Sequence, residues 1–247
     1  LLMLGCKPLT PAESETLSSD EAQTPPSDWQ YVVMGDSATW GYPEKLAGSI
    51  EQAYGVDVAL NIHTVGGQHS SHLLNQLQSD EKLREDIRNA ALITFVVPTN
   101  VFETPLITYT SSSPERCGGE DNQDCLREAL EIYKADTESI VQEITTLADN
   151  ENSIVIAHDV WQFNTTLLKE SDDFKVVNGY FQAFNAHVQS VCDQYGIPVA
   201  NVYTEFMGQD HSRNPEKEGL IYDGFHTTDK GQDIIVTLMM DLINERH

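Results

Sequence analysis

The sequence is poor in basic residues: 14 lysines and arginines stand against 39 aspartates and glutamates, a formal net charge of −25. A surface this acidic repels phosphate backbones, so the composition argues against nucleic acid as a partner. Long apolar runs are also lacking, and no stretch is long enough to span a bilayer. A chain of 247 residues, 40% of them hydrophobic, can bury a full core in one domain. We therefore expect a globular protein whose excess charge is mainly a solvated surface.

Motifs for structural or protease-type zinc sites are absent too, because the sequence has no Cys-x-x-Cys pair and no His-Glu-x-x-His. His63, His69 and His72 lie close together in the sequence, but no acid or cysteine completes a ligand set with them. We interpret them as surface histidines and predict no metal site.

The four cysteines are few and unevenly placed. The first six residues, LLMLGC, are apolar and end at Cys6, like the tail of a bacterial lipoprotein signal whose cysteine is lipid-modified; the alternative is a cysteine there by chance. Residues 7–28 are rich in Pro, Ser, Thr and acids and predict a disordered tether. We expect residues 1–28 to be a truncated signal and acidic tether, and the protein to be extracytoplasmic, secreted or membrane-anchored through Cys6. Its oligomeric state is not indicated.

Cys117 and Cys125 bracket a polar stretch, CGGEDNQDC, which a short disulfide would close. Such a pairing suits an oxidising compartment and agrees with export. The two cysteines fall in an insertion-like loop, residues 103–125, long enough to form a lid or rim over a site.

The folded domain is expected to cover residues 29–247, where strand-like runs alternate with helical patterns. The strand-like runs are residues 31–35, 57–65, 91–97, 153–161 and 197–203. Alternation of this kind predicts an α/β fold with a parallel sheet covered on both faces.

The helical patterns follow the strands in turn. They cover residues 43–55, 70–90, 125–149, 174–196 and 228–246. Pro43 signals the start of the first helix and Gly55 its end.

Residues able to do chemistry come just after the strands, where parallel sheets bind ligands. Ser37 follows the first strand, and a serine becomes an effective nucleophile when a base takes its proton. Of the eight histidines, only His226 has an acid three residues before it, Asp223. A carboxylate so placed can fix the tautomer of the base. Asp36 is interpreted as structural, holding the turn through backbone N–H groups.

Negative charge that develops on a carbonyl oxygen needs fixed donors. The backbone N–H groups of Ser37 and Gly67 and the side-chain amide of Asn100 would supply three, and all follow strands. No G-x-S-x-G occurs, which excludes the nucleophile elbow of the α/β-hydrolases.

Together these motifs resemble the SGNH (GDSL-type) hydrolase family. GDSATWG matches the first block of that family, GGQHSSHLL resembles the second, and DGFHTTDKG fits the last. The third block usually reads G-x-N-D, and here PTN carries Asn100, with Pro98 and Val101 in place of the glycine and the aspartate. The resemblance implies one three-layer α/β/α sandwich with a five-stranded parallel sheet of flavodoxin-like order.

The resemblance also implies a catalytic triad of Ser37, Asp223 and His226, an oxyanion hole of Ser37, Gly67 and Asn100, and no cofactor. The expected activity is ester hydrolysis through an acyl-enzyme, on a small-molecule or glycan ester. The altered third block motivates an alternative, a non-catalytic surface lipoprotein that binds carbohydrate. Acyl transfer to an alcohol is a third reading, and the sequence does not name the substrate.

Several further side chains are expected near the site. Aromatic residues that follow strands or lie in loops are candidates for a substrate pocket or for loop packing: Trp40, Phe102, Tyr109, Trp161 and Phe163. His158 and Asp159 end the fourth strand and are expected to border the cleft, although a structural buried histidine is an equal alternative.

Overall fold

The structure, a computed structural model, describes residues 29–111, 117–148, 153–171 and 173–246. The predicted signal and tether, residues 1–28 with Cys6, lie outside the described residues, so export and lipidation stay predictions. In the part of the chain that is described, no helix is both long enough and apolar enough to cross a membrane.

The described residues form a sheet of five parallel strands in the order β2-β1-β3-β4-β5. This is the flavodoxin-like order, so the predicted fold class is confirmed. The strands are β1 (Trp29–Gly35), β2 (Val58–Thr64), β3 (Leu92–Phe95), β4 (Ile154–His158) and β5 (Val199–Ala200).

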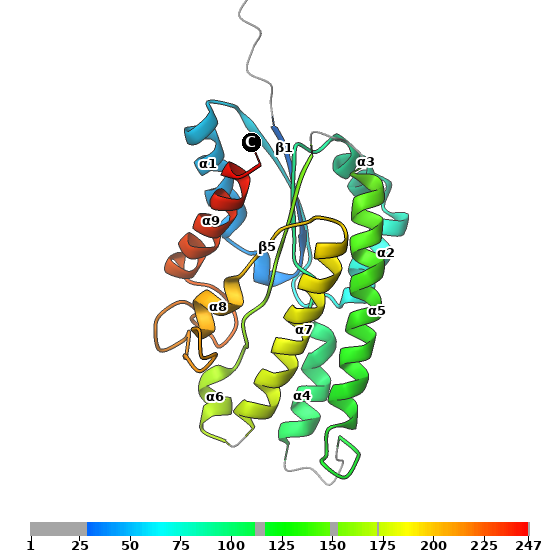
Figure 1. The fold of residues 1–247 in the computed structure, drawn as a ribbon, viewed down its shortest axis with the longest axis vertical. Coiled ribbons are helices and arrows are strands. Elements are labelled where there is room, and N and C mark those ends of the chain that lie inside the picture. Colours follow the sequence, from blue (N-terminus) through cyan, green and yellow to red (C-terminus); the bar gives the residue numbers. More distant parts are fainter. Residues whose placement is uncertain (1–28, 112–116, 149–152, 172, 247) are drawn as a thin grey trace, which may run out of the picture.

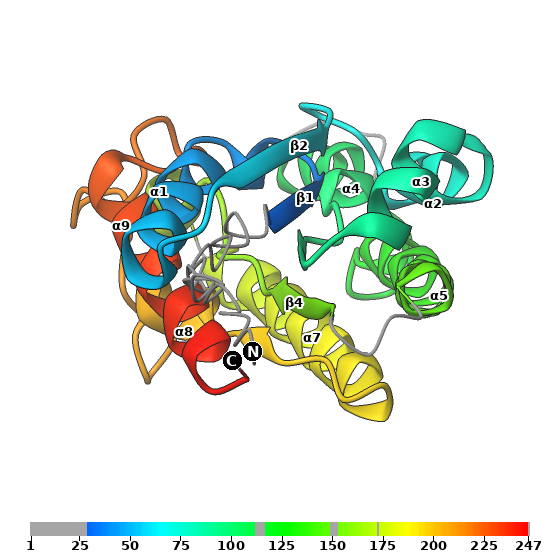
Figure 2. The same cartoon turned by 90° about the horizontal axis from the view of Figure 1, so that it is seen from above.

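Helices cover both faces of the sheet, which gives three layers (Figures 1 and 2). One face carries α1 (Tyr42–Tyr54), α8 (Val202–Met207) and α9 (Asp229–Asn244). The other carries α2 (Ser70–Ser79), α3 (Glu81–Asn89), α5 (Asp124–Leu147) and α7 (Phe174–Gln194). Two shorter helices, α4 (Glu103–Thr110) and α6 (Thr165–Lys169), lie beyond the carboxyl ends of the strands (Figure 1).

The core follows from the apolar runs of the central strands. Residues 31–34 of β1 and residues 92–95 of β3 are fully buried, as expected for strands covered on both faces. The edge strand β2 is only partly covered, and Ile62 on it remains 48% exposed. Ser37 and Asn100 therefore follow the two fully buried central strands, whereas Gly67 follows the edge strand β2.

Helix boundaries agree with the sequence signals at α1, which has Pro43 in its first turn and ends at Gly55, whose φ is 67°. The prediction of one long helix over residues 70–90 is wrong, because α2 and α3 are separate helices. Asp80 separates them: its Oδ1 accepts the backbone N–H groups of Lys82 (3.0 Å) and Leu83 (3.2 Å). An aspartate that caps a new helix in this way ends the previous one.

The fifth strand is much shorter than the predicted run 197–203, since β5 holds only Val199 and Ala200 and the chain enters α8 at Val202. The carboxylate of Asp159, just after β4, explains the change, because its Oδ1 accepts the backbone N–H of Tyr203 at 2.7 Å. This bond satisfies a donor of the first turn of α8 from outside the helix.

The insertion after β3 is partly helical, contrary to the predicted loop. Residues 100–102 form a 3₁₀ turn, and α4 follows directly. Phe102 anchors this segment in the core, with its ring perpendicular to that of Phe184 at a centroid distance of 5.1 Å. Further along, Cys117 and Cys125 form the expected disulfide.

Candidate active site

Ser37 is held at the end of β1 by the residues on either side of it. Gly35 has a φ of +139°, and a side chain there would clash with Val96 on the neighbouring segment. Asp36 then caps the 3₁₀ turn of residues 37–39, because its Oδ1 accepts the N–H of Ala38 at 2.9 Å. The tight turn places the largely buried Ser37 at the base of a pocket.

Asp223 and His226 come together in the loop before α9. Nδ1 of His226 lies 2.6 Å from Oδ2 of Asp223. The other oxygen, Oδ1, accepts the backbone N–H groups of His226 (2.7 Å) and Phe225 (3.1 Å). Partial burial raises the pKa of Asp223, but these hydrogen bonds outweigh it and hold the pKa below its ordinary value. The carboxylate is thus ionised at neutral pH and fixes the Nδ1–H tautomer of the imidazole.

The segment after β4 supports this loop. The indole N–H of Trp161 donates to the backbone carbonyl of Phe225 at 2.9 Å. The backbone N–H of Asn164 donates to the carbonyl of Gly224 at 2.7 Å. Gly224 has a φ of +83°, a backbone conformation that residues with a side chain rarely adopt, so this turn favours glycine. The loop is therefore fixed to the body of the fold at two adjacent points.

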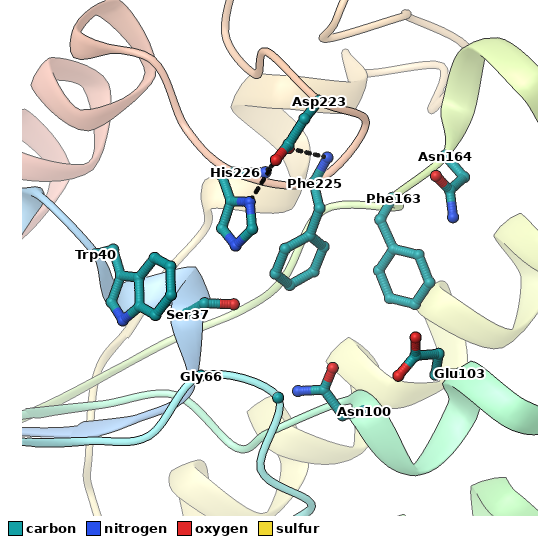
Figure 3. A pocket seen from close by; sticks show the side chains of 11 residues that line it. Ser37, Trp40, Gly66, Asn100, Glu103, Phe163, Asn164, Asp223, Phe225 and His226 are labelled. Carbon is teal, nitrogen blue, oxygen red and sulfur yellow. Dashed lines mark hydrogen bonds and ion pairs between the residues drawn. The ribbon is translucent and has the colours of Figure 1, made fainter.

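Trp40 lies against the imidazole ring of His226. The ring centroids are 5.1 Å apart and the planes differ by 4°. Trp40 itself lies over Gly66, where a Cβ would be 2.7 Å from the indole. The stack leaves Nε2 of His226 directed toward the side of the pocket where Ser37 lies (Figure 3).

Asn100 approaches the site from the opposite side. Its Nδ2 donates to Oδ2 of Asp36 (2.7 Å) and to the backbone carbonyl of Gln68 (3.0 Å). Both neighbours are acceptors, so the nitrogen rather than the oxygen of the amide must face them. Since the two protons of the amide already have acceptors, donation to an oxyanion would share one of them in a three-centre hydrogen bond. Gly67, in the turn after β2, has a φ of 73° and also faces the pocket.

Asp36 is an unusual carboxyl group, because burial raises its pKa from 3.8 to about 6. This pKa is the net result, because the hydrogen bond from the Ala38 N–H and the nearby His226 oppose part of the effect of burial. Its two oxygens join the 3₁₀ turn of residues 37–39 to Asn100, so its structural role extends beyond the turn predicted from sequence.

The pocket that these groups share has a volume of about 490 Å³ (Figure 3). Its lining brings together all five residues predicted for the triad and oxyanion hole with six others: Ser37, Trp40, Gly66, Gly67, Asn100, Glu103, Phe163, Asn164, Asp223, Phe225 and His226. Mixed aromatic and polar walls around one hydroxyl suit a small organic substrate.

Of the aromatic residues expected near the site, the structure places some in the pocket lining and others outside it. Trp40 and Phe163 line the pocket, whereas Phe102 and Trp161 are buried in the core and Tyr109 lies outside the pocket lining. Glu103, Asn164 and Phe225 were not predicted. Only their positions in the sequence could have indicated two of them: Glu103 lies three residues after Asn100, and Phe225 lies inside the DGFH motif.

His158 and Asp159 do not border the pocket as expected. His158 is 1% exposed, and burial lowers its pKa to about 4. Burial likewise raises the pKa of Asp159 to about 7, although hydrogen bonds from the Tyr203 and Val202 N–H groups lower it in part. Both residues belong to the core of the fold.

The clustered histidines near β2 also have other partners. Nε2 of His63 lies 2.8 Å from Oδ2 of Asp86, and the rings of His69 and His72 lie 5.8 Å apart. Within the described ranges, no group of three or more histidine, cysteine or acidic side chains could hold a metal ion.

Comparisons with known proteins agree with the fold. A crystal structure of the lipase Lip_vut3 from a goat rumen metagenome superposes with a TM-score of 0.68 at 17% identity, covering 87% of this chain and 97% of the lipase. The acetylxylan esterase Axe2 from Geobacillus stearothermophilus gives 0.62 at 13% identity, covering 86% and 93%. A GDSL-like lipase from Bacteroides thetaiotaomicron gives 0.53 at 20% identity, covering 88% of each chain.

No curated protein sequence matches the chain significantly. The structural similarities, all at low identity, establish the shared fold. The sequence model of the GDSL-like lipase/acylhydrolase family matches residues 33–234, from within β1 to within α9, a span that contains every residue of the candidate site. The chain belongs to the GDSL-like lipase/acylhydrolase family.

Proposed function

We propose that this protein hydrolyses carboxylic esters through an acyl-enzyme on Ser37. The observation that carries the proposal is the 2.6 Å contact between Asp223 and Nδ1 of His226 in the pocket that holds Ser37. With the proton on Nδ1, Nε2 of the neutral ring has a free lone pair and can act as the base.

In the first half of the reaction, the Ser37 hydroxyl attacks the ester carbonyl carbon while its proton passes to Nε2 of His226. Asp223 stabilises the imidazolium that forms. The negative charge on the carbonyl oxygen is held by the N–H groups of Ser37 and Gly67 and by the amide of Asn100. The C–O bond to the alcohol then breaks, and His226 returns its proton to the leaving alkoxide.

In the second half, water takes the place of the alcohol. His226 removes a proton from the water as it attacks the acyl-enzyme, and the second tetrahedral intermediate releases the carboxylic acid and restores the Ser37 hydroxyl. The scheme uses only residues of this chain and needs no cofactor. An alcohol in place of water at this step would give acyl transfer.

The experiment is hydrolysis of p-nitrophenyl acetate by the wild type and by Ser37→Ala, followed by measurement of released nitrophenol. Ester turnover that Ser37→Ala abolishes would support the proposal. A wild type that turns over no ester and does not react with a fluorophosphonate would overturn it and favour the carbohydrate-binding alternative. Acetylated xylooligosaccharides are a suitable second substrate, because the acetylxylan esterase Axe2 shares the fold.

A further inference from the structure

A second cavity adjoins the pocket of Ser37 on the side away from Trp40. It measures about 300 Å³ and lies between α4 and α6. Glu103, Phe163 and Asn164 line both cavities, so the two adjoin at these three residues. We call the second cavity the α4–α6 groove.

Four of the ten residues that line the α4–α6 groove are aliphatic, and Phe163 adds an aromatic ring. Leu106 and Leu168 form its buried floor, while Ile107 and Leu167 are 60% and 68% exposed. These two are among the most exposed large apolar side chains of the described residues. A pair of exposed aliphatic side chains along a hollow that opens from an active site is typical of a subsite for an apolar group.

The polar residues of the groove stand at its ends. Glu103 and Asn164 lie at the junction with the Ser37 pocket, and Asp173 and Ser171 are at the other end with Thr110. The pKa of the Tyr109 phenol is raised by partial burial and by the nearby Asp173, which indicates that Asp173 lies close to α4. Carboxylates at both ends disfavour an anionic ligand, so the group that fits between them is neutral as well as apolar.

The geometry of the proposed reaction assigns this group to one half of the ester. The tetrahedral carbon has four substituents, and Ser37 Oγ is one. The leaving oxygen must lie near His226 to receive its proton, and the oxyanion must lie near Gly67 and Asn100. The substituent that remains is the acyl carbon, and the open direction is toward Phe163 and Glu103, on the far side of the pocket from Trp40 (Figure 3).

We infer that the α4–α6 groove binds the acyl chain of the substrate, and that the enzyme prefers esters of medium-chain, unbranched, neutral acids to acetate esters. The inference rests on the proposed function, since it needs the acyl-enzyme on Ser37. Along α4 the groove extends from Glu103 to Thr110, roughly 10 Å at the rise of a helix, before its lining becomes polar. The length of the apolar part therefore sets an upper limit on the chain that gains from it.

The test compares kcat/KM for p-nitrophenyl octanoate with kcat/KM for p-nitrophenyl acetate. Burial of each methylene contributes up to about fourfold, so the wild-type ratio should exceed about ten. In the double variant Ile107→Ser, Leu167→Ser the ratio should fall on the order of tenfold. Ile132→Ser is the matched control, because Ile132 is also an exposed aliphatic side chain (45%) but lies on α5 outside the groove. It should keep the wild-type ratio.

Two further measurements sharpen the result. Leu167→Trp should fill the groove and move the preference toward shorter acyl chains. A second series, acetate esters of alcohols of increasing length, should show no change in chain-length preference in either groove variant, because the alcohol leaves on the side of His226.

The outcomes separate this inference from the proposed function. Hydrolysis of acetate by the wild type, together with an octanoate-to-acetate ratio that the groove variants leave unchanged, would overturn the acyl-chain assignment alone. A change confined to the alcohol series would also overturn it. Absence of any ester hydrolysis and of fluorophosphonate labelling would overturn both.

Discussion

The indole of Trp40 and the imidazole of His226 lie face to face, 5.1 Å between centroids and 4° between planes. Asp223 fixes one edge of the imidazole ring, and Trp40 restricts the rotation that the contact with Asp223 alone would leave open. Trp40 is 49% exposed, so its value to the fold as a core residue is small. We interpret it as a positioning residue for the base.

Trp40→Ala should therefore lower kcat by up to about tenfold, the effect of losing one aromatic stack, with little change in KM or in the free energy of unfolding. Trp40→Phe should restore most of the activity, because a flat ring remains. Tyr195→Ala is the control, since Tyr195 has a similar exposure (45%) and does not line the pocket. Steady-state kinetics on p-nitrophenyl acetate would decide, and equal losses in the Ala and Phe variants would contradict the stacking role.

Asp223→Asn keeps the size of the side chain but should lower kcat by about 10³–10⁴-fold. The amide oxygen can still accept the two backbone N–H groups, so the amide nitrogen would face Nδ1 of His226. The ring would then carry its proton on Nε2 and could not act as base. Burst kinetics and circular dichroism would check this, and a folded variant within tenfold of the wild type would show that another group orients the histidine.

Asn100→Ala should lower kcat on the order of 10²-fold, as loss of one oxyanion donor does elsewhere. The substitution also removes the side-chain amide that donates a hydrogen bond to Oδ2 of Asp36, so the free energy of unfolding should fall as well. The two roles are separable by measuring kcat and urea denaturation on the same preparation. A variant that loses stability but keeps wild-type kcat would assign Asn100 to the support of Asp36 alone.

Asp159 should make stability depend on pH. Its pKa is raised in the folded protein to about 7, mainly by burial, so between about pH 4 and 7 the folded state holds a proton that the unfolded chain has released. Stability from this group is therefore present at low pH and lost as the pH rises toward 7. The pKa of His158 is lowered to about 4, and this shift makes stability rise with pH instead. The pH dependence of stability of the wild type alone therefore does not isolate the contribution of Asp159.

Comparison of the wild type with Asp159→Asn isolates the contribution of Asp159 to the pH dependence of stability. Relative to wild type, the variant should become more stable by a few kcal/mol as the pH rises from 4 to 8, because it has no carboxyl to ionise. Urea unfolding at a series of pH values measures the difference. A difference that is constant over this range would contradict the raised pKa.

Much of the fold was predictable because its signals are local. Apolar runs such as residues 31–35 predict buried strands, and Pro43 and Gly55 mark the ends of α1. The boundaries that failed depend on contacts between distant residues. The carboxylate of Asp159 ends β5 from a neighbouring strand, and the anchoring of Phe102 against Phe184 turns the start of an expected loop into a helix.

The residues of the site also divide into those marked by local motifs and those placed by contacts with distant residues. Ser37, Gly67, Asn100, Asp223 and His226 follow strands or precede a helix in recognisable motifs, and the structure brings all five to one pocket. No motif marks Asn164 or Glu103 individually, although Glu103 begins the insertion, residues 103–125, that was expected to form a lid or rim over a site. Asn164 reaches the pocket through the backbone bond to Gly224, and Glu103 does so because α4 begins there.

An acyl-enzyme on Ser37 is tested by fluorophosphonate labelling of the protein, with the modified peptide located by mass spectrometry. We expect one adduct, on Ser37, that Ser37→Ala abolishes and whose formation His226→Ala slows greatly in a folded protein. Stable modification at another residue, or no labelling of a wild type that hydrolyses esters, would contradict an acyl-enzyme on Ser37.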